Sequence, residues 1–262
     1  MDNRPIGIFD SGIGGTSIWG ELQELLPYED CIYLADSKNA PYGEKSKERI
    51  LEFSIKNTEY LLALECKLIV VACNTATTNA IEYLRQNYKV PFIGIEPAIK
   101  PAAINSKSKI IGVLATKGTL SSSLFHSTSK NHAAGITVLE QRGTGLVEMI
   151  EQGNLQSDEL YALLEGYISP MLKKGMDYLV LGCTHYPYLI PILKKMLPEN
   201  VTIIDSGQAV ALQTKSVLEK FDLLSKSHER GSHQFFSNKN EKVLSNILPL
   251  NKLNLTVSFK DF

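Results

Sequence analysis

Two cysteines of this chain stand in the same sequence setting, 110 positions apart. Cys73 comes directly after the apolar run 68–72, and Cys183 comes directly after the apolar run 178–182. Small polar residues follow each cysteine and open a helix-like segment. A short apolar run of this kind is typical of a buried parallel strand that ends at the carboxyl edge of a sheet, where α/β proteins bind ligands. One thiol at each of two such edges predicts two catalytic thiols.

A second pair of segments repeats at nearly the same offset. Residues 6–11 read IGIFDS and residues 111–116 read IGVLAT, an offset of 105. Two pairs in one order at nearly one offset indicate two similar α/β halves. Chance similarity between β-branched strands is the alternative explanation for segments this short. Related halves would bind a ligand between them, with one thiol on each side.

Strand-like and helix-like patterns alternate along the chain. Strands are predicted near residues 5–9, 31–35, 67–72, 91–95, 109–114, 136–140, 177–182 and 201–204. Helices are predicted near residues 14–26, 45–63, 75–88, 118–131, 157–173, 187–196 and 207–220. This alternation is typical of parallel sheets covered by helices. We therefore expect an α/β fold of two similar, doubly wound domains with a site in the cleft between them.

The chain ends with a further strand, helix and strand, predicted at 232–236, 241–248 and 253–257. No linker rich in Pro, Gly and Ser interrupts the sequence, so the crossing between domains should be short, near Glu96 and Pro97. Because the second set of repeated motifs lies within 98–208, we expect that segment to form the second domain. The first domain is then discontinuous and comprises residues 1–97 with 209–262.

Composition argues against several classes of protein. With 262 residues and 44% hydrophobic content, the chain can bury one large core or two ordinary ones. The formal net charge is −1, so we expect neither a nucleic acid nor a membrane partner. The sequence shows no secretion signal or membrane-spanning stretch. Four cysteines are too few for a disulfide framework and suit a reducing cytoplasm; we expect Cys31 and Cys66 to be simply buried.

Three polar motifs lie at other strand ends, at residues 9–17, 35–43 and 204–207. The first places Asp10 and Ser11 before a glycine-rich turn, whose backbone N–H groups can approach an anion at a helix start. The turn lacks the Walker lysine, and its glycine spacing departs from the dinucleotide fingerprint, which disfavours a nucleotide site. The other two motifs can equally be an ordinary turn and an ordinary helix start.

Five segments together resemble glutamate racemase. They are GIFDSGIGG at 7–15, PYG at 41–43, VACNTA at 71–76, GIEP at 94–97 and LGCTHYP at 181–187. They occur in the family's order and at its separations. The resemblance implies an enzyme without cofactor or metal that interconverts L- and D-glutamate for cell-wall peptidoglycan. It also implies two α/β domains with the active site in the cleft, and a homodimer.

Racemisation removes the α-hydrogen on one face of a carbon and returns a proton on the other, so two acid/base groups must flank that carbon. The resemblance implies that Cys73 takes the proton from D-glutamate and that Cys183 takes it from L-glutamate. A free thiol has a pKa of about 8.5, which a helix N-terminus or hydrogen bonds can lower. Asp10 and His185 match family residues that tune proton transfer and hold the substrate ammonium. An N-cap role for Asp10 and a helix-start role for His185 are the alternatives.

The resemblance also implies a set of residues that hold the carboxylates and amine of the substrate. These are Ser11, Pro41, Tyr42, Gly43, Asn74, Thr75, Thr116 and Thr184, together with Asp10 and His185. Hydroxyls and backbone N–H groups at helix starts suit an anionic ligand.

The local sequence departs from the family pattern at three places. A catalytic family glutamate matches Glu151 best, with Glu148 as the competing position. Asn39 stands where the family has an arginine before Pro-Tyr-Gly. If that arginine supports the loop or a subunit contact, this chain does so differently. We see no N-terminal extension of the kind that some members use to sense a cell-wall precursor, and therefore do not expect that activation.

Other functions compete with this interpretation. A related racemase for aspartate or hydantoins would share the two thiols, and only the FDSG and PYG motifs argue against it. A cysteine hydrolase could use Cys183 with His185 but would leave Cys73 without a role. A zinc module needs three or four ligands, and this Cys-x-His pair supplies two. A non-catalytic flavodoxin-like binding domain would tolerate alkylation of both thiols.

Overall fold

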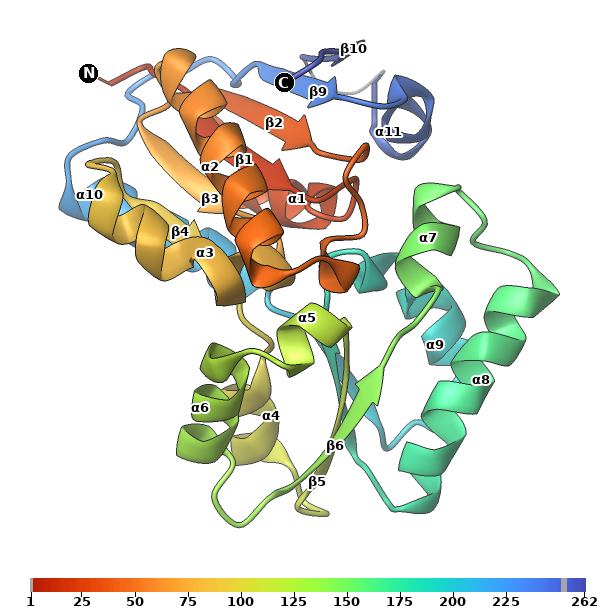
Figure 1. The fold of residues 1–262 in the computed structure, drawn as a ribbon. Coiled ribbons are helices and arrows are strands. Elements are labelled where there is room, and N and C mark those ends of the chain that lie inside the picture. The colour runs from red at the N-terminus through yellow and green to blue at the C-terminus, as the bar shows by residue number, and fades with distance from the viewer. Residues whose placement is uncertain (1, 251–253) are drawn as a thin grey trace.

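The computed structural model describes residues 2–250 and 254–262, and its strands form two parallel sheets (Figure 1). The six-stranded sheet has the order β10-β9-β2-β1-β3-β4, and the four-stranded sheet has the order β6-β5-β7-β8. The strands of the first are β1 (Ile6–Asp10), β2 (Cys31–Ala35), β3 (Leu68–Val71), β4 (Phe92–Gly94), β9 (His233–Ser237) and β10 (Leu255–Phe259). Those of the second are β5 (Ile110–Ala115), β6 (Thr137–Arg142), β7 (Tyr178–Gly182) and β8 (Thr202–Ile204). The predicted α/β class with two parallel sheets is confirmed.

Helices cover these sheets in two groups, the upper and lower parts of Figure 1. With the first sheet lie α1 (Thr16–Leu25), α2 (Lys47–Ala63), α3 (Asn74–Asn87), α10 (Gly207–Lys220) and α11 (Glu241–Ile247). With the second lie α4 (Ile99–Asn105), α5 (Lys117–Leu120), α6 (Ser123–His132), α7 (Leu146–Glu151), α8 (Asp158–Lys173) and α9 (Ile190–Met196). Single 3₁₀ turns are η1 (Tyr42–Glu44) and η2 (Tyr186–Leu189). Within the described residues no helix is both long and apolar enough to cross a membrane.

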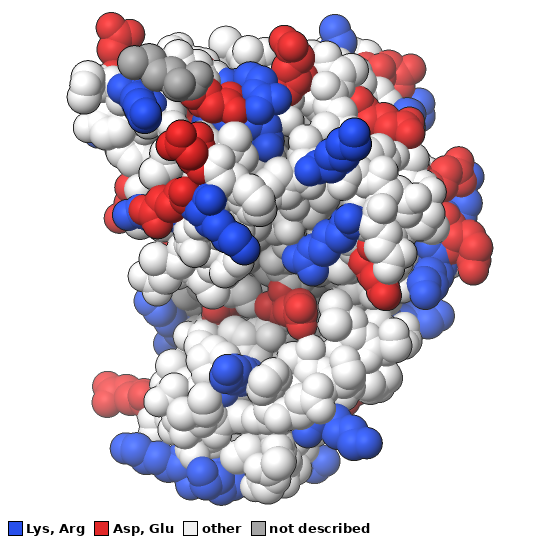
Figure 2. All heavy atoms as spheres, turned by 90° about the vertical axis from the view of Figure 1, so that its left-hand side faces the viewer, with Lys and Arg blue, Asp and Glu red and all other residues white. Residues whose placement is uncertain are grey.

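Sequence periodicity explains why these elements form. The central strands β1, β2 and β3 are buried at every position, as expected for apolar runs covered by helices on both faces. Helix α3 buries Ala76, Ala80 and Leu84, which recur every four residues and face the sheet. Figure 2 shows basic and acidic side chains interspersed over the face that it displays, in keeping with the near-zero net charge.

The predicted strands form within two residues of their expected bounds, although residue 253 of the last one lies outside the described residues. The helix predicted at 118–131 is instead two helices. Ser122 interrupts it, because its hydroxyl caps α6 by accepting a hydrogen bond from Phe125 N–H at 3.1 Å. Helices α4 and α7 were not predicted, since both are short.

Strand register brings the predicted site residues to the ends of the two sheets. In the first sheet the ends of β1 and β3 are aligned, so Asp10 and Cys73 leave the sheet at one edge. In the second sheet the ends of β5 and β7 are aligned, so Thr116 and Cys183 leave it together. Each thiol therefore lies at a carboxyl edge, where parallel sheets bind ligands.

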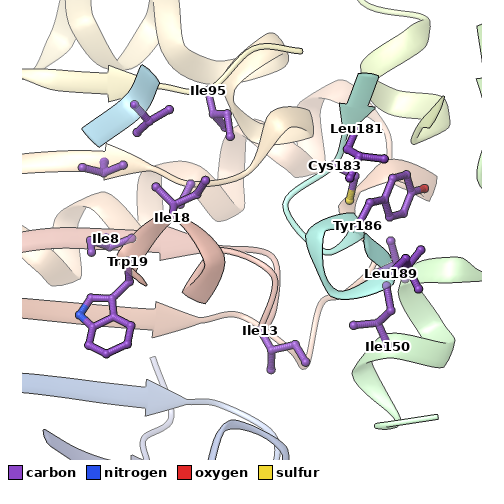
Figure 3. Packing of buried hydrophobic residues seen from close by; sticks show 14 of the residues in the cluster. Ile8, Ile13, Ile18, Trp19, Ile95, Ile150, Leu181, Cys183, Tyr186 and Leu189 are labelled. Carbon is purple, nitrogen blue, oxygen red and sulfur yellow. The ribbon is translucent and has the colours of Figure 1, made fainter. Parts of the chain in front are cut away.

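One hydrophobic cluster extends from the first sheet into the second. Figure 3 shows Ile13 on the loop after β1, with Ile150 of α7 and Leu189 of η2 across from it. Cys183 belongs to the same cluster. The carboxyl edges of the two sheets are thus packed against each other around buried side chains.

A buried histidine anchors the C-terminal strands to helix α1. Trp19 Nε1 donates a hydrogen bond to Nδ1 of His233 at 3.3 Å, and the two rings meet edge to face at 5.2 Å. Trp19 also packs edge-on against Phe235 of the same strand, at 4.9 Å. Burial lowers the pKa of His233 to about 4. At neutral pH the imidazole is therefore uncharged and can accept the hydrogen bond from the indole N–H of Trp19.

This histidine should make stability pH-dependent. Its folded pKa lies below the unfolded value of about 6.5, so the unfolded chain binds the proton more readily and stability falls as pH drops from about 6.5 towards 4. We expect the free energy of unfolding, measured by urea titration, to fall over this pH interval by roughly 2 kcal/mol more in the wild type than in His233→Asn. The exposed His126→Gln variant should follow the wild type. Equal slopes for wild type and His233→Asn would contradict the assignment.

Candidate active site

Both predicted thiols are buried and unpaired with other cysteines. Cys73 is 4% exposed and is the N-cap residue of α3, where its sulfur accepts a hydrogen bond from Ala76 N–H at 3.4 Å. Cys183 is 7% exposed and follows β7 directly. Cys31 and Cys66 are also free and buried, as expected. Neither of the two site thiols can meet a substrate unless the surrounding edge opens.

Asp10 and Ser11 contact Cys73 on one side and the residue next to Cys183 on the other. Ser11 Oγ is 3.6 Å from the sulfur of Cys73, while Asp10 accepts a hydrogen bond at 3.3 Å from the hydroxyl of Thr184, the neighbour of Cys183. The backbone N–H groups of Ser11 and Gly15 donate to Asp10 at 2.7 and 2.6 Å. Asp10 is not the N-cap of α1, which is Gly15. Its carboxylate instead links the end of β1 to the residue after Cys183.

The electrostatic setting keeps a proton on Cys73. Burial raises its pKa well above the usual value, and the Asp10 carboxylate raises it further. Hydrogen bonds with Ala76 N–H and Ser11 oppose the rise without cancelling it. The helix N-terminus therefore lowers this pKa less than burial raises it. In this arrangement the sulfur of Cys73 is therefore held as the thiol.

His185 stands between Cys183 and a carboxylate. Its Nδ1 is 3.8 Å from the sulfur of Cys183, and its Nε2 is 2.6 Å from Oε1 of Glu151. Burial lowers the pKa of His185, but the hydrogen bonds with Cys183 and Glu151 outweigh burial and hold it well above its usual value. A positive imidazolium therefore lies beside the second thiol. The two thiols have opposite surroundings.

Glu151 receives hydrogen bonds from both halves of the molecule. Besides His185, it accepts the backbone N–H of Ile13 at 2.7 Å and the hydroxyl of Ser37 at 3.0 Å. Burial raises its pKa, but these donors more than offset the effect and lower it. The competing Glu148 is exposed to solvent. Among the two glutamates, geometry favours Glu151 as part of the site.

The glycine-rich turn contacts this pair closely. A Cβ atom at Gly12 would lie 1.9 Å from Oε1 of Glu151, and a Cβ atom at Gly14 would lie 2.3 Å from Nδ1 of His185. Both distances are shorter than any side chain tolerates. A side chain at Gly14 would also meet the backbone nitrogen of His185 at 2.6 Å and so requires a shift of the chain, whereas one at Gly12 would displace the carboxylate end of Glu151.

Hydroxyl groups gather where α3 and α5 begin. Thr75 Oγ1 is 2.8 Å from Thr116 Oγ1, and Thr119 Oγ1 lies 3.1 Å from Thr116 Oγ1. A Cβ atom at Gly43 would come within 2.7 Å of Thr116, so the Pro-Tyr-Gly loop reaches the second half here. Thr119 was not predicted from the sequence. Its position three residues after Thr116, the N-cap residue of α5, is the signal that could have identified it.

Asn74 presents an unused polar group next to Cys73. It is 3% exposed, and neither atom of its side-chain amide has a hydrogen-bond partner among the described residues. Leaving such a group unpaired is unfavourable by about 1–3 kcal/mol. The amide is available for the carboxylate or amine of a ligand.

Tyr42 does not present its side chain to the site. It is 1% exposed, and its hydroxyl donates to Asp36 and accepts from Asn57 Nδ2. Asn39, in place of the family's arginine, donates to the same Asp36 carboxylate at 2.8 Å. Only the backbone of Pro41, Tyr42 and Gly43 is therefore free to meet a ligand.

An ion pair that the sequence did not suggest joins η1 of the first half to β6 of the second half. Arg142, at the end of β6, contacts both carboxylate oxygens of Glu44 in η1 at 2.7 and 2.8 Å. The pair lines a small cavity together with Pro41 and Thr116. In residues 2–250 and 254–262, no group of three or more His, Cys, Asp and Glu side chains is arranged to hold a metal ion.

Comparison with known proteins adds to this geometry. A family model described as Asp/Glu/Hydantoin racemase matches residues 20–214. Glutamate racemase from Ectopseudomonas mendocina is 45% identical over 251 residues, 95% of each chain.

Solved structures agree with these sequence matches. Glutamate racemase isoform RacE1 from Bacillus anthracis superposes with a TM-score of 0.87 at 29% identity, covering 100% of this chain and 98% of that one. Glutamate racemase from Escherichia coli, in complex with L-glutamate and the activator UDP-MurNAc-ala, gives 0.85 at 32% identity and 98% coverage of both chains. The chain therefore belongs to the Asp/Glu/hydantoin racemase family and, within it, to the glutamate racemases.

Proposed function

We propose that this chain interconverts L- and D-glutamate without a cofactor and supplies D-glutamate for peptidoglycan. The observation that carries the proposal is the pair of buried thiols at the ends of β3 and β7, with Asp10 hydrogen-bonded to Thr184, the residue after Cys183. Relatives named glutamate racemase at 45% identity favour glutamate over aspartate or hydantoins as the substrate. The E. coli neighbour was solved with L-glutamate bound.

The surroundings of the thiols support a direction for each proton. From L-glutamate, the thiolate of Cys183 takes the α-proton with His185 beside it. Cys73, whose pKa is raised by burial and by Asp10, then gives its proton to the opposite face of the carbanion. Once D-glutamate has formed, Cys183 is the thiol and Cys73 is the thiolate. This is the state from which D-glutamate is converted back, or which exchanges a proton with solvent.

Substrate binding falls to the polar groups around the thiols. The free amide of Asn74 and the hydroxyls of Thr75 and Thr116 suit a carboxylate at the starts of α3 and α5. The remaining binding residues proposed are Ser11, Thr184 and the backbone of Pro41, Tyr42 and Gly43. Asp10 holds the ammonium, His185 tunes proton transfer at Cys183 as an imidazolium, and Glu151 keeps His185 oriented.

The domain assignment is also proposed, with residues 1–97 and 209–262 forming one domain and residues 98–208 the other. Pairing of β9 with β2, and packing of α10 against α1, support the return of the C-terminal segment to the first domain. The two crossings adjoin, since Ser206 Oγ donates to the carbonyl of Glu96. We further propose a cytoplasmic homodimer, on the basis of the family resemblance.

Removing one thiol at a time tests the opposed-base mechanism. In deuterated water, Cys73→Ala should exchange the α-hydrogen of L-glutamate with retained configuration, because Cys183 can still remove and return it. Cys183→Ala should do the same for D-glutamate. Racemisation should fall by about 10²–10⁴-fold in each. Chiral separation with mass spectrometry measures both effects, and exchange of the same enantiomer by both variants would contradict the mechanism.

The close contact of the glycine-rich turn with His185 gives a second test. In Gly14→Ala the new methyl would lie 2.3 Å from Nδ1 of His185 and 2.6 Å from its backbone nitrogen. We expect the displaced imidazole to lower kcat by about 10²-fold. Gly20→Ala is the matched control, since a Cβ there meets nothing within 4 Å. A Gly14→Ala enzyme with the kcat of Gly20→Ala would show that the position of His185 is unimportant.

A further inference from the structure

Asn238 reaches from the C-terminal segment to the loop that follows β2. It lies just after β9 and is 4% exposed. Its Oδ1 accepts a hydrogen bond from the backbone N–H of Lys38 at 2.9 Å, and its Nδ2 donates to Oδ1 of Asp36 at 2.5 Å. Both functions of the amide are therefore used on one loop, residues 36–43. None of the motifs in the sequence pointed to this residue.

Asp36 collects the hydrogen bonds that shape this loop. The carboxylate is 3% exposed and accepts from Asn238, from Asn39 Nδ2 and from the hydroxyl of Tyr42. A buried carboxylate with several donors fixes the backbone on either side of it. Two of these donors belong to the loop itself, and only Asn238 comes from outside it. Asn238 therefore ties the loop to the sheet beneath.

The loop touches the second half of the molecule at both of its ends. Near its start, Ser37 donates to Glu151 at 3.0 Å, and Glu151 lies 2.6 Å from Nε2 of His185. At its end, the backbone of Gly43 packs against Thr116. Displacing the loop by a fraction of an ångström would disturb both the partner of Cys183 and the proposed carboxylate site.

We propose that Asn238 is a positioning residue for racemisation, acting through Asp36 and the loop 36–43 on the Ser37–Glu151–His185 series beside Cys183. The inference rests on the proposed function for its kinetic part. It assigns to the C-terminal segment a role in the geometry of the active site, although Asn238 touches neither thiol. The effect should be greater on the proton transfer made by Cys183 than on that made by Cys73.

Three variants separate this role from a general loss of stability. Asn238→Asp keeps the acceptor for Lys38 but sets two carboxylates against each other at Asp36. The double variant Asn238→Asp with Asp36→Asn restores one donor and one acceptor across the same contact. Asn240→Ala is the matched control, because Asn240 lies in the same segment, is exposed, and caps only Lys242 N–H at 3.0 Å.

The kinetic readout is kcat and the primary deuterium isotope effect for each enantiomer labelled at the α-position. We expect Asn238→Asp to lower kcat by about 10²-fold, since small displacements have effects of that size. The double variant should regain about tenfold of that loss, because it restores the contact with position 238 but loses the hydrogen bond from Asn39 to the same Asp36 oxygen. Asn240→Ala should match the wild type. The isotope effect of Asn238→Asp should rise for L-glutamate, whose deuteron Cys183 removes, more than for D-glutamate.

Amide hydrogen exchange of residues 36–44 provides a readout that does not depend on activity. The exchange rate of this segment should rise in Asn238→Asp, fall again in the double variant and stay at the wild-type rate in Asn240→Ala. If the exchange rates change across the variants as expected but the wild type does not racemise glutamate, the proposed function is wrong while the contact between Asn238 and Asp36 is confirmed. Unchanged kcat in Asn238→Asp, no recovery in the double variant, or equal isotope effects for both enantiomers would overturn the positioning role.

Discussion

The carboxylate of Glu151 joins the two halves of the molecule at the edge where the thiols lie. It accepts hydrogen bonds from Ile13 and Ser37 of the first half and lies against His185 of the second. Three donors around one buried carboxylate define its position closely. The close approach of Glu151 to Gly12 of the turn after β1 and the raised pKa of His185 both depend on this contact.

The same arrangement gives the two thiols different electrostatic surroundings. Asp10 and burial keep the proton on Cys73, whereas His185 places a positive charge beside Cys183. Racemisation needs one base and one acid at any moment, on opposite sides of one carbon. Two thiols in identical surroundings would lack this difference. Here the difference comes from one aspartate at the end of β1 and one histidine just after β7, strands of the two different sheets.

Sequence patterns predicted the strands and the two thiols, because a buried parallel strand has a strong apolar signal and ends at a ligand-binding edge. They missed short helices such as α7, whose six residues carry little periodicity. The partners of Glu151 lie 34, 114 and 138 positions away, so no local pattern could reveal them. Arg142 and Asn238 were missed for the same reason, since their roles depend on chain segments that meet only in the fold.

The central claim is that two opposed groups handle the α-proton. It is tested most directly by converting L-glutamate with wild-type protein in deuterated water, with no added cofactor, and stopping after a few per cent of reaction. The account predicts that the D-glutamate formed carries deuterium at the α-carbon while the remaining L-glutamate is still protiated, because one thiol removes the proton and the other delivers one from solvent. D-glutamate that retains the original α-hydrogen would show a single base returning the same proton. That result would contradict the account.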